Sequence, residues 1–339
     1  MNTIAAIQKN KYERHFNFEN SNISNNFGDI SHEILKYRDL LDEPLRSAFD
    51  HHFKKNGKLL RADLALRAAH SKHYTNASCV RWAASVELLH NASLVHDDVC
   101  DDDSERRGRA SVAEMYGKEI AICLGDALIA LSSFILASDH SLRHALAAQS
   151  VAILKLSTGQ AAEFGSAHYP TWKAYEHLVE GKTTPLISLP VIGLTPNETS
   201  DPASERIIRY ISEASVAFQM MNDIQNICHG KACGSPATDL KVLRPNAVIA
   251  KFYESLPEIE KGLFTRSKIA KFTPENYARI QFWWEKILLS DSLSVTRKLL
   301  GEKLERSQLI LASLDDKNQE ILEPFNKWLH KSYSTLSSQ

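Results

Sequence analysis

The sequence lacks the features that mark several classes of protein. Its five cysteines are odd in number and include no CxxC pair, which favours reduced thiols in the cytoplasm over a disulfide or zinc framework. Lysine and arginine (40) nearly balance aspartate and glutamate (41), so no basic footprint for nucleic acid or an anionic membrane is present. No stretch approaches the roughly 18 uninterrupted apolar residues of a membrane span, and the first residues lack the apolar core of a signal peptide. We therefore expect a cytoplasmic protein with no nucleic-acid partner and no membrane span.

Strand signals are also scarce, whereas helical spacing of apolar residues dominates from about residue 30. Leu35, Tyr37, Leu40 and Leu41 are expected to open the first helix. The spacing predicts further helices over residues 79–97, 119–137, 145–164, 172–188, 203–229, 245–254, 275–290, 292–314 and 317–331. No repeat or shift in composition marks a boundary. We predict an all-α fold, one helical domain over residues 29–335 packed around a central cavity, after a flexible polar leader over residues 1–28.

The most informative segment is acidic and spans residues 88–109, LLHNASLVHDDVCDDDSERRGR. On a helix, Asp97 and Asp101 share one face and Asp98 lies beside them. Such a cluster is tolerable beside a cation, and Mg²⁺ is typically shared between one or two carboxylates and substrate phosphates. Arg106 and Arg107 follow at once, and guanidinium matches phosphate oxygens bidentately. An isolated acidic run is as often a solvated loop, but a loop needs neither the apolar lead-in nor the arginines. The segment predicts a magnesium–diphosphate site.

Five further segments carry candidate site residues, and three of them have a plainer alternative. Lys58 and Arg61 follow a glycine at a helix start, where anions bind, although a solvated basic turn has the same pattern. His90 lies on the apolar helix, where a satisfied core histidine is the commoner case. Lys182 and Thr183 suit a phosphate but do not form a P-loop. The fourth segment is a polar strip on an otherwise apolar helix, which an internal hydrogen-bond network also explains; it consists of Gln219, Asn222, Asp223 and Asn226. The fifth is the charged loop after this helix, which includes Arg244.

Assembled in this order, these segments resemble the trans-isoprenyl diphosphate synthases, also called polyprenyl synthetases. The resemblance covers about residues 30–335. The segment LVHDDVCDDDSERRGRASV is similar to the family's first aspartate-rich motif, and ICLGDALIA, GQAAEFG and GKTTPL are similar to its middle part. FQMMNDIQN occupies the place of the second aspartate-rich motif, and TDLKVLRPNAV the loop after it. The resemblance implies the all-α isoprenoid-synthase fold and, commonly, a homodimer formed through helix packing, which the apolar run 119–137 could serve as well as a core.

The resemblance also implies roles for individual residues. Two to three Mg²⁺ ions would be held by Asp97, Asp98 and Asp101 and, at the second motif, by Asn222, Asp223 and Asn226. The allylic diphosphate would contact Arg106, Lys182, Thr183 and Gln219, with Arg244 adding a cation. The second substrate, isopentenyl diphosphate, would be held by Lys58, Arg61, His90 and Arg107. The implied reaction is ionisation of the allylic C–O bond, attack by the isopentenyl double bond and loss of a proton, in a cavity that excludes water. Catalytic roles would fall to Asp97, Asp98, Asp101, Lys182 and Asp223.

The second motif departs from the family pattern. Aspartate is usual at the places of Asn222, Asp223 and Asn226, and two of the three carboxylates are amides here, which weakens the third metal site. Three hypotheses follow: an active prenyl diphosphate synthase; a class I terpene synthase or a prenyltransferase with an unusual acceptor; and a non-catalytic regulatory subunit. The cyclase pattern Asn–Asp–x–x–Ser/Thr–x–x–x–Glu is matched at Asn222 and Asp223 but not at Asn226 and Gly230. The intact first motif favours an active synthase.

Product length is expected from residues that precede the first aspartate. By the resemblance, the floor of the chain pocket lies four and five residues before it, at Ser93 and Ala92. Both side chains are small and would not stop a growing chain, whereas Leu88 and Leu89, one to two turns deeper, could. We therefore expect a product of farnesyl length or longer.

Overall fold

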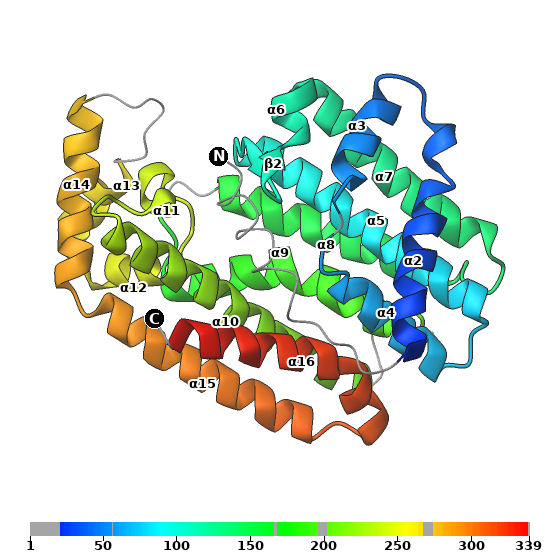
Figure 1. The fold of residues 1–339 in the computed structure, drawn as a ribbon. Coiled ribbons are helices and arrows are strands. Elements are labelled where there is room, and N and C mark those ends of the chain that lie inside the picture. The colour runs from blue at the N-terminus through cyan, green and yellow to red at the C-terminus, as the bar shows by residue number, and fades with distance from the viewer. Residues whose placement is uncertain (1–20, 56, 166–167, 196–201, 267–273, 338–339) are drawn as a thin grey trace, which may run out of the picture. The chain divides into compact units, whose positions relative to one another are not determined.

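The computed structural model describes residues 21–55, 57–165, 168–195, 202–266 and 274–337. Helices dominate these residues, and the two strands among them, β1 (Glu105–Arg106) and β2 (Arg109–Ala110), form a short antiparallel hairpin. The prediction of an all-α fold is confirmed (Figure 1). Two compact units are distinguished: unit 1 comprises residues 1–62 and 75–135, and unit 2 comprises residues 63–74 and 136–339.

Unit 1 is organised by the long helix α5 (Asn76–Cys100), which Thr75 caps by accepting a hydrogen bond from the backbone N–H of Ser78. Most of its apolar side chains are buried, because helices pack against several of its faces. The side chains of Ser85 on α5 and Ser132 on α7 are hydrogen-bonded at 3.0 Å. The remaining elements of unit 1 are α2 (Ser21–Leu35), the 3₁₀ turn η1 (Arg38–Leu40), α3 (Leu45–Phe53), the hairpin, α6 (Val112–Tyr116) and most of α7 (Lys118–Ser138).

One glycine sets how closely two helices of unit 1 approach. A Cβ atom at Gly125 of α7 would lie 2.1 Å from the His96 ring of α5, so no larger residue fits without displacing the imidazole. The His96 ring is in turn 3.3 Å from the carbonyl oxygen of Ile122. This close contact lies next to the acidic end of α5 and fixes its distance from α7.

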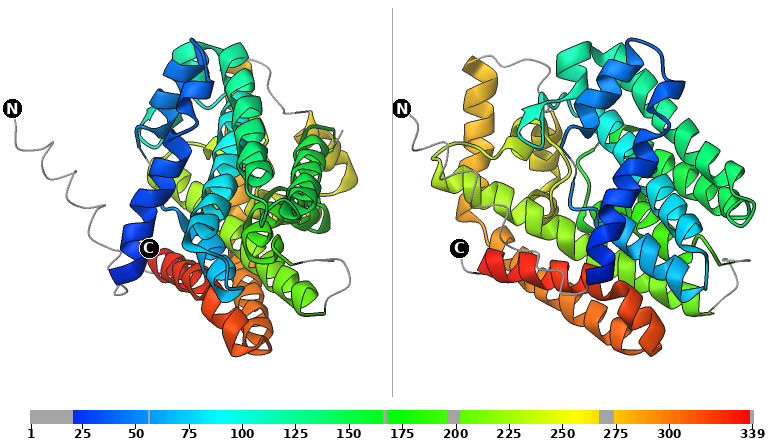
Figure 2. Two further views of the ribbon diagram at one scale, coloured as in Figure 1. Left: turned by 90° about the vertical axis from the view of Figure 1, so that its right-hand side faces the viewer. Right: turned by 45° about the vertical axis from the view of Figure 1, so that its right-hand side comes forward.

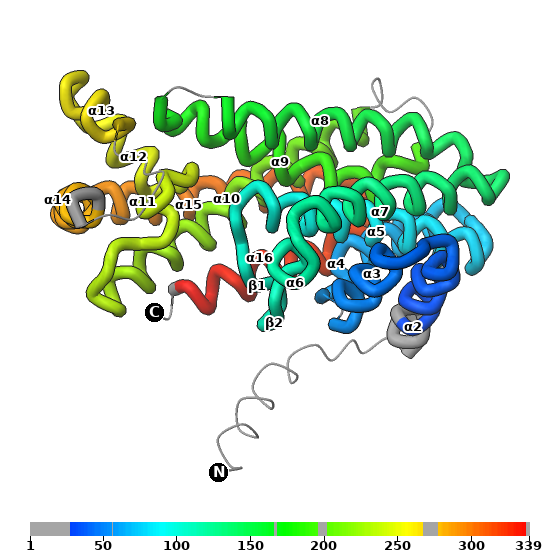
Figure 3. The backbone as a smooth tube through the Cα atoms, turned by 90° about the horizontal axis from the view of Figure 1, so that it is seen from above, coloured from blue at the N-terminus to red at the C-terminus, as the bar shows by residue number. Residues whose placement is uncertain are grey.

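Unit 2 is a layered set of long helices (Figures 2 and 3). Helix α10 (Pro202–Ala232) packs against α9 (Trp172–Ile192) on one side and α15 (Ser292–Ala312) on the other. Lys303 of α15 joins the three helices by ion pairs to Glu176 of α9 at 2.9 Å and Glu213 of α10 at 2.8 Å. The other helices are the larger part of α4 (Leu60–Ser71), α8 (Ala145–Gly165), α11 (Thr238–Val242), α12 (Ala247–Ser255), α13 (Glu258–Thr265), α14 (Pro274–Leu289) and α16 (Asp316–Ser337).

Helices α8 and α9 cross where both carry a glycine. A Cβ atom at Gly159 would lie 2.5 Å from the carbonyl carbon of Gly181, so the two backbones touch at this point. Both glycines belong to motifs singled out in the sequence, GQAAEFG and GKTTPL. They let the helix that carries Lys182 pack directly on its neighbour.

The predicted helices from residue 79 onward agree with the observed ones to within a few residues, but the start of the chain differs. The prediction that Leu35 to Leu41 open the first helix is wrong: α2 ends at Leu35, and only the 3₁₀ turn η1 follows. Leu41 has an extended backbone and Pro44 caps the start of α3, so the leucines of this stretch lie in the connection between two helices. Helix α2 begins at Ser21, inside the predicted leader, while residues 1–20 lie outside the described residues.

Helix α7 bears on the prediction of no membrane span. Among the described residues, it is the one helix that by length and composition could cross a membrane, with 44% of its apolar window buried in the structure. Leu124, Leu128 and Ile135 are fully buried, which is typical of a core helix in a soluble protein. Ile122 and Phe134 remain about half exposed on the same helix.

Candidate active site

The first acidic motif lies at the C-terminal end of α5, and its central residue is an internal ion-pair partner. Asp98 is only 1% exposed and accepts a hydrogen bond from Nε of Arg106 at 2.8 Å, with a second contact from the same guanidinium to the same oxygen. Its other oxygen, Oδ2, is buried and has no hydrogen-bond partner among the described residues. Burial raises the pKa of Asp98, and the guanidinium of Arg106 opposes that shift. The structure thus brings together two residues that were predicted to bind different groups.

Asp97 and Asp101 occupy one face of α5, as the spacing predicts. The backbone N–H of Asp101 donates to the carbonyl oxygen of Asp97 at 2.8 Å, so the last helical turn includes both residues, and both side chains are half-buried. Among the described residues, no group of three or more acidic, histidine or cysteine side chains is close enough to hold a metal ion by itself. Two aligned carboxylates suit Mg²⁺, which takes its remaining ligands from water and substrate phosphates. The residues present therefore fit a shared magnesium–diphosphate site.

A basic cluster in the same unit contains the residues predicted for the second diphosphate. One guanidinium nitrogen of Arg61 is 3.2 Å from Nε2 of His90, and because arginine only donates, Nε2 is the acceptor. His90 therefore carries its proton on Nδ1, and burial lowers its pKa well below the usual value. That Nδ1–H and the Nε–H of Arg61 are both out of contact with solvent and lack an acceptor among the described residues. Buried N–H donors without an acceptor are unusual in a folded protein, and an anionic oxygen would satisfy them.

The other two predicted cations of unit 1, Lys58 and Arg107, lie outside the helices. Lys58 is exposed just before α4, and Leu59 has a positive φ of 53°. Arg107, at the tip of the β1–β2 hairpin, also has a positive φ of 56°. This conformation is uncommon outside glycine and is typical of residues that a tight turn aims in one direction.

The second acidic motif, in unit 2, has a buried centre. Asp223 of α10 is 2% exposed, and its oxygens accept hydrogen bonds from the hydroxyl of Tyr175 at 2.6 Å, Nε2 of Gln219 at 2.8 Å and the backbone N–H of Ala247 at 2.7 Å. Burial raises the pKa of Asp223 to about 7, against the opposing effect of the Tyr175 hydrogen bond, and Asp239 raises it further. The carboxylate thereby joins α9, α10 and the start of α12.

The two asparagines of the motif differ in their surroundings. Asn222 is exposed, whereas Nδ2 of Asn226 donates to the hydroxyl of Thr238 at 2.6 Å and its Oδ1 accepts from the backbone N–H of Asp239 at 3.4 Å. The motif therefore also anchors the loop that leads to Arg244, whose side chain is half-buried.

Two predicted residues on α9 complete the set in unit 2. Lys182 forms an ion pair with Glu163 of α8 at 2.8 Å, and Thr183 is half-buried beside it. Gln219, Asp223 and Asn226 of the polar strip all form hydrogen bonds within the protein, as the alternative of an internal network predicts.

Sequence reasoning missed the residues that hold this motif in place. The hydroxyl of Tyr169 donates to the carbonyl oxygen of Arg244 at 2.7 Å and accepts from the backbone N–H of Asn246 at 3.0 Å. Asn246 caps α12 and donates to Asp239 at 2.8 Å. Its position before an apolar helix is an N-cap signal that the sequence does offer. Nothing in the sequence pairs Tyr169 with it.

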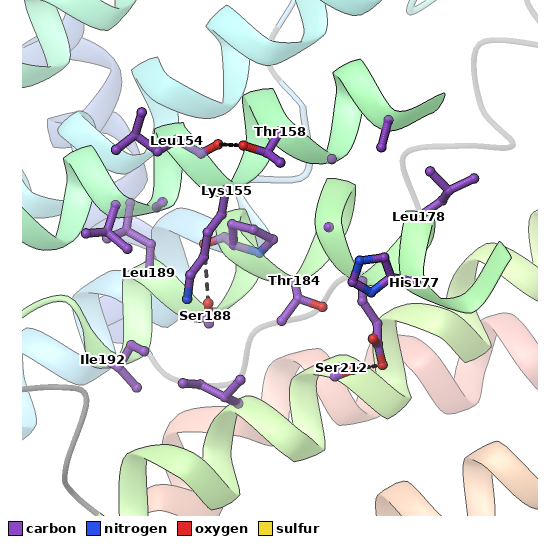
Figure 4. Close-up of a pocket in the computed structure, with 18 of the residues that line it drawn as sticks. Leu154, Lys155, Thr158, His177, Leu178, Thr184, Ser188, Leu189, Ile192 and Ser212 are labelled. Atoms are coloured by element: carbon purple, nitrogen blue, oxygen red, sulfur yellow. Dashed lines mark hydrogen bonds between the residues drawn. The ribbon is translucent and has the colours of Figure 1, made fainter. Parts of the chain in front are cut away.

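A cavity of about 520 Å³ lies between α8, α9 and α10 of unit 2 (Figure 4). Its walls are mostly apolar, with Leu154, Leu189 and Ile192 among them, and Lys155 and His177 add polar groups. The hydroxyl of Thr184 also lines it and has no hydrogen-bond partner among the described residues. None of the predicted site residues lines this cavity.

Comparison with known proteins identifies the family. The model of the polyprenyl synthetase family matches residues 42–276. The chain belongs to the polyprenyl synthetase family. A short chain isoprenyl diphosphate synthase of Methanocaldococcus jannaschii is 29% identical over 239 residues, which cover 68% of this chain and 73% of the relative. A (2E,6E)-farnesyl diphosphate synthase of Mycobacterium tuberculosis is 30% identical over 219 residues, 58% of this chain and 61% of the relative.

Solved structures share the fold over nearly the whole chain. A decaprenyl diphosphate synthase from Rhodobacter capsulatus has a TM-score of 0.74 at 21% identity and covers 91% of this chain and 97% of its own. A polyprenyl synthetase from Streptomyces coelicolor has a TM-score of 0.72 at 22% identity, covering 90% of this chain and 98% of its own. The predictions of the family, its all-α fold and a trans-prenyltransferase are confirmed.

In this polyprenyl synthetase, the residues predicted to limit product length lie on α5, within unit 1. Leu89 and Ala92 are each 1% exposed, and Leu88 is fully buried. Ser93 is half-buried, and its hydroxyl donates to the carbonyl oxygen of His90 at 2.7 Å. The small Ala92 and Ser93 precede Asp97 by about one turn of the helix.

Proposed function

We propose that the chain condenses an allylic diphosphate with isopentenyl diphosphate to give a trans-prenyl diphosphate of farnesyl length or longer, with Mg²⁺ as cofactor. The observation that carries the proposal is the end of α5, where Asp97 and Asp101 share a face beside the buried Asp98–Arg106 ion pair. In this arrangement Asp97 and Asp101 would hold Mg²⁺ together with diphosphate oxygens, and the ion would supply positive charge to the departing diphosphate.

The protein's own residues prepare the site for two anions. The ion pair with Asp98 fixes the guanidinium of Arg106, so that its remaining N–H groups are presented in one orientation. Arg61 and His90 offer unsatisfied N–H donors, and Lys58 and Arg107 add charge for the isopentenyl diphosphate. Neutral His90 donates through Nδ1–H without adding a second charge beside Arg61.

With the second motif as it is, we infer that the whole site binds fewer than three Mg²⁺ ions strongly. Asp223 is enclosed by three hydrogen-bond donors, and Asn226 uses its amide oxygen within the protein. Asn222 alone presents an exposed oxygen, and a neutral amide attracts Mg²⁺ less than a carboxylate does. We therefore infer that the ions shared with Asp97 and Asp101 carry most of the electrostatic role, and that Lys182, Thr183, Gln219 and Arg244 act on the allylic diphosphate as cations and donors.

A specific observation weighs against the cyclase alternative. A Cβ atom at Gly230 would lie 2.9 Å from the backbone nitrogen of Ala237 and the carbonyl oxygen of Ser235. The glutamate that completes the class I cyclase pattern at this place would collide with that backbone. A non-catalytic regulatory subunit that binds no diphosphate gives no reason for the unsatisfied N–H donors of Arg61 and His90.

A homodimer in the cytoplasm is part of the proposal. Apolar side chains are exposed on α7, at Ile122 and Phe134, and on α8, at Val151, Leu154 and Phe164. A soluble protein presents such side chains on long helices at interfaces with other chains. All five cysteines are free thiols, which agrees with a reducing compartment.

The residue-level test replaces one metal ligand. Asp97→Asn keeps the shape of the side chain and removes its charge, so Mg²⁺-dependent formation of longer prenyl diphosphates is expected to fall by about 100-fold. Asp102→Asn is the matched control, because exposed Asp102 pairs with Lys118 instead. Turnover by Asp97→Asn equal to that of the control would overturn the metal assignment.

A further inference from the structure

Asn91, one residue after His90 on α5, is a buried amide whose hydrogen-bonding capacity is completely used. It is 2% exposed. Its Nδ2 donates to the carbonyl oxygen of Glu87 at 2.8 Å and to Oε1 of the Glu87 side chain at 3.1 Å. Its Oδ1 lies 2.9 Å from Nε2 of His52 on α3 and 3.2 Å from a guanidinium nitrogen of Arg107 on the hairpin. One side chain thus joins two secondary-structure elements to α5.

The partners fix the orientation of this amide. Arginine has only donors and a backbone carbonyl only accepts, so Oδ1 must face Arg107 and Nδ2 must face Glu87. His52 then has to donate through Nε2–H, which both the neutral Nε2–H tautomer and the imidazolium can do. Burial lowers the pKa of His52 to about 4, so the neutral Nε2–H tautomer is the form present near pH 7. Reversing the amide would break contacts on both of its ends.

Arg107 is held from three directions. Its second terminal nitrogen, Nη1, donates to the carbonyl oxygen of Lys55 at 2.8 Å, and Nζ of Lys55 donates to the carbonyl oxygen of Arg107 at 3.0 Å. Its guanidinium also lies against Gly57, where a Cβ atom would be only 3.0 Å from Nη2. A free arginine side chain has many rotamers, and these contacts select one. Asn91 is the contact that comes from the helix bearing the acidic motif.

We propose that Asn91 is a positioning residue, which orients Arg107 toward the diphosphate of the isopentenyl substrate and couples that cation to α5. The proposal rests on the proposed function, in which Arg107 binds this diphosphate. Glu87 and His52 support this role, because they hydrogen-bond to Nδ2 and Oδ1 of the Asn91 amide. Asn91 does not itself contact substrate, so its loss acts through Arg107.

The test is a double-mutant cycle with Asn91→Leu and Arg107→Gln. Asn91→Leu keeps the volume and removes both ends of the amide, and Asn91→Thr retains one hydroxyl that can accept from Arg107. The expected result for Asn91→Leu is a rise of about tenfold or more in the KM for isopentenyl diphosphate, with the KM for the allylic diphosphate nearly unchanged and partial rescue by Asn91→Thr. Asn91→Leu in the Arg107→Gln background should add little, because the two residues act as one unit.

Ser132→Ala is the matched control, since it removes a buried hydrogen bond to Ser85 of α5 in the same unit, away from the cations. Additive effects of the Asn91 and Arg107 substitutions would overturn the proposal, as would equal changes in both KM values. Calorimetric titration with inorganic diphosphate gives a second readout that needs no turnover. If the wild type elongates no substrate, the proposed function fails, and the same cycle on diphosphate affinity still decides whether Asn91 positions Arg107.

Discussion

His52 gives a pH dependence of stability that can be worked out from the structure. Its imidazole is buried between α3 and α5, and burial lowers its pKa from 6.5 to about 4. The unfolded chain therefore binds a proton between these pH values that the folded chain does not. Stability from this group is complete above pH 6.5 and is lost as the pH falls toward 4. A displacement of this size corresponds to about 3 kcal/mol of unfolding free energy.

Substituting His52→Gln removes the titrating group and leaves an amide that can still donate to Asn91. The unfolding free energy can be measured by urea titration at pH values from 4 to 7, with the fluorescence of buried Trp82 and the other tryptophans as the signal. Between pH 7 and pH 4, the variant should lose about 3 kcal/mol less of this free energy than the wild type. His140→Gln, at an exposed position, shows what the loss of one surface imidazole does. Parallel curves for the wild type and His52→Gln would show that the pKa of His52 does not change on folding, because carboxylates titrate alike in both proteins.

Three further predictions follow from the site and the surface. Ala92→Phe places a ring at a position that is 1% exposed, so product analysis should show shorter chains, and an unchanged product distribution would show that the chain pocket lies elsewhere. Asn222→Asp with Asn226→Asp restores two carboxylates, so titration with Mn²⁺ and inorganic diphosphate should show tighter metal binding; equal affinity would place the remaining metal site away from this motif. Leu154→Glu puts a charge on a side chain that is 67% exposed, so the mass measured by light scattering should fall from that of a dimer to that of a monomer. An unchanged mass would exclude α8 from the dimer interface.

The sequence predicted the helices from residue 79 onward because their apolar spacing repeats over many turns, and that spacing follows from burial alone. It also predicted that Asp97 and Asp101 share a face, since this requires only a helix. The first helix was predicted wrongly because residues 35–41 have helical apolar spacing, although the chain there forms a 3₁₀ turn and an extended Leu41 that connect α2 to α3.

The contacts that define the candidate site depend on residues far apart in the chain. Tyr175 reaches Asp223 from another helix, and no local pattern pairs a tyrosine with an aspartate 48 residues away. Asn91 likewise meets His52, which lies 39 residues before it. The sequence groups Asp98 with its acidic neighbours as a metal ligand. Only the β1–β2 hairpin brings Arg106 close enough to donate a hydrogen bond to it. Local pattern gives the secondary structure and the residue types, whereas tertiary packing decides which carboxylates are open to a metal.

Chain elongation by this protein is measured by incubating it with Mg²⁺ and dimethylallyl, geranyl, farnesyl or geranylgeranyl diphosphate, each with and without isopentenyl diphosphate, followed by extraction and mass spectrometry. We expect longer prenyl diphosphates, at farnesyl length or beyond, that form only when isopentenyl diphosphate is present. Hydrocarbons or alcohols formed without isopentenyl diphosphate, or no product in any mixture, would contradict this expectation.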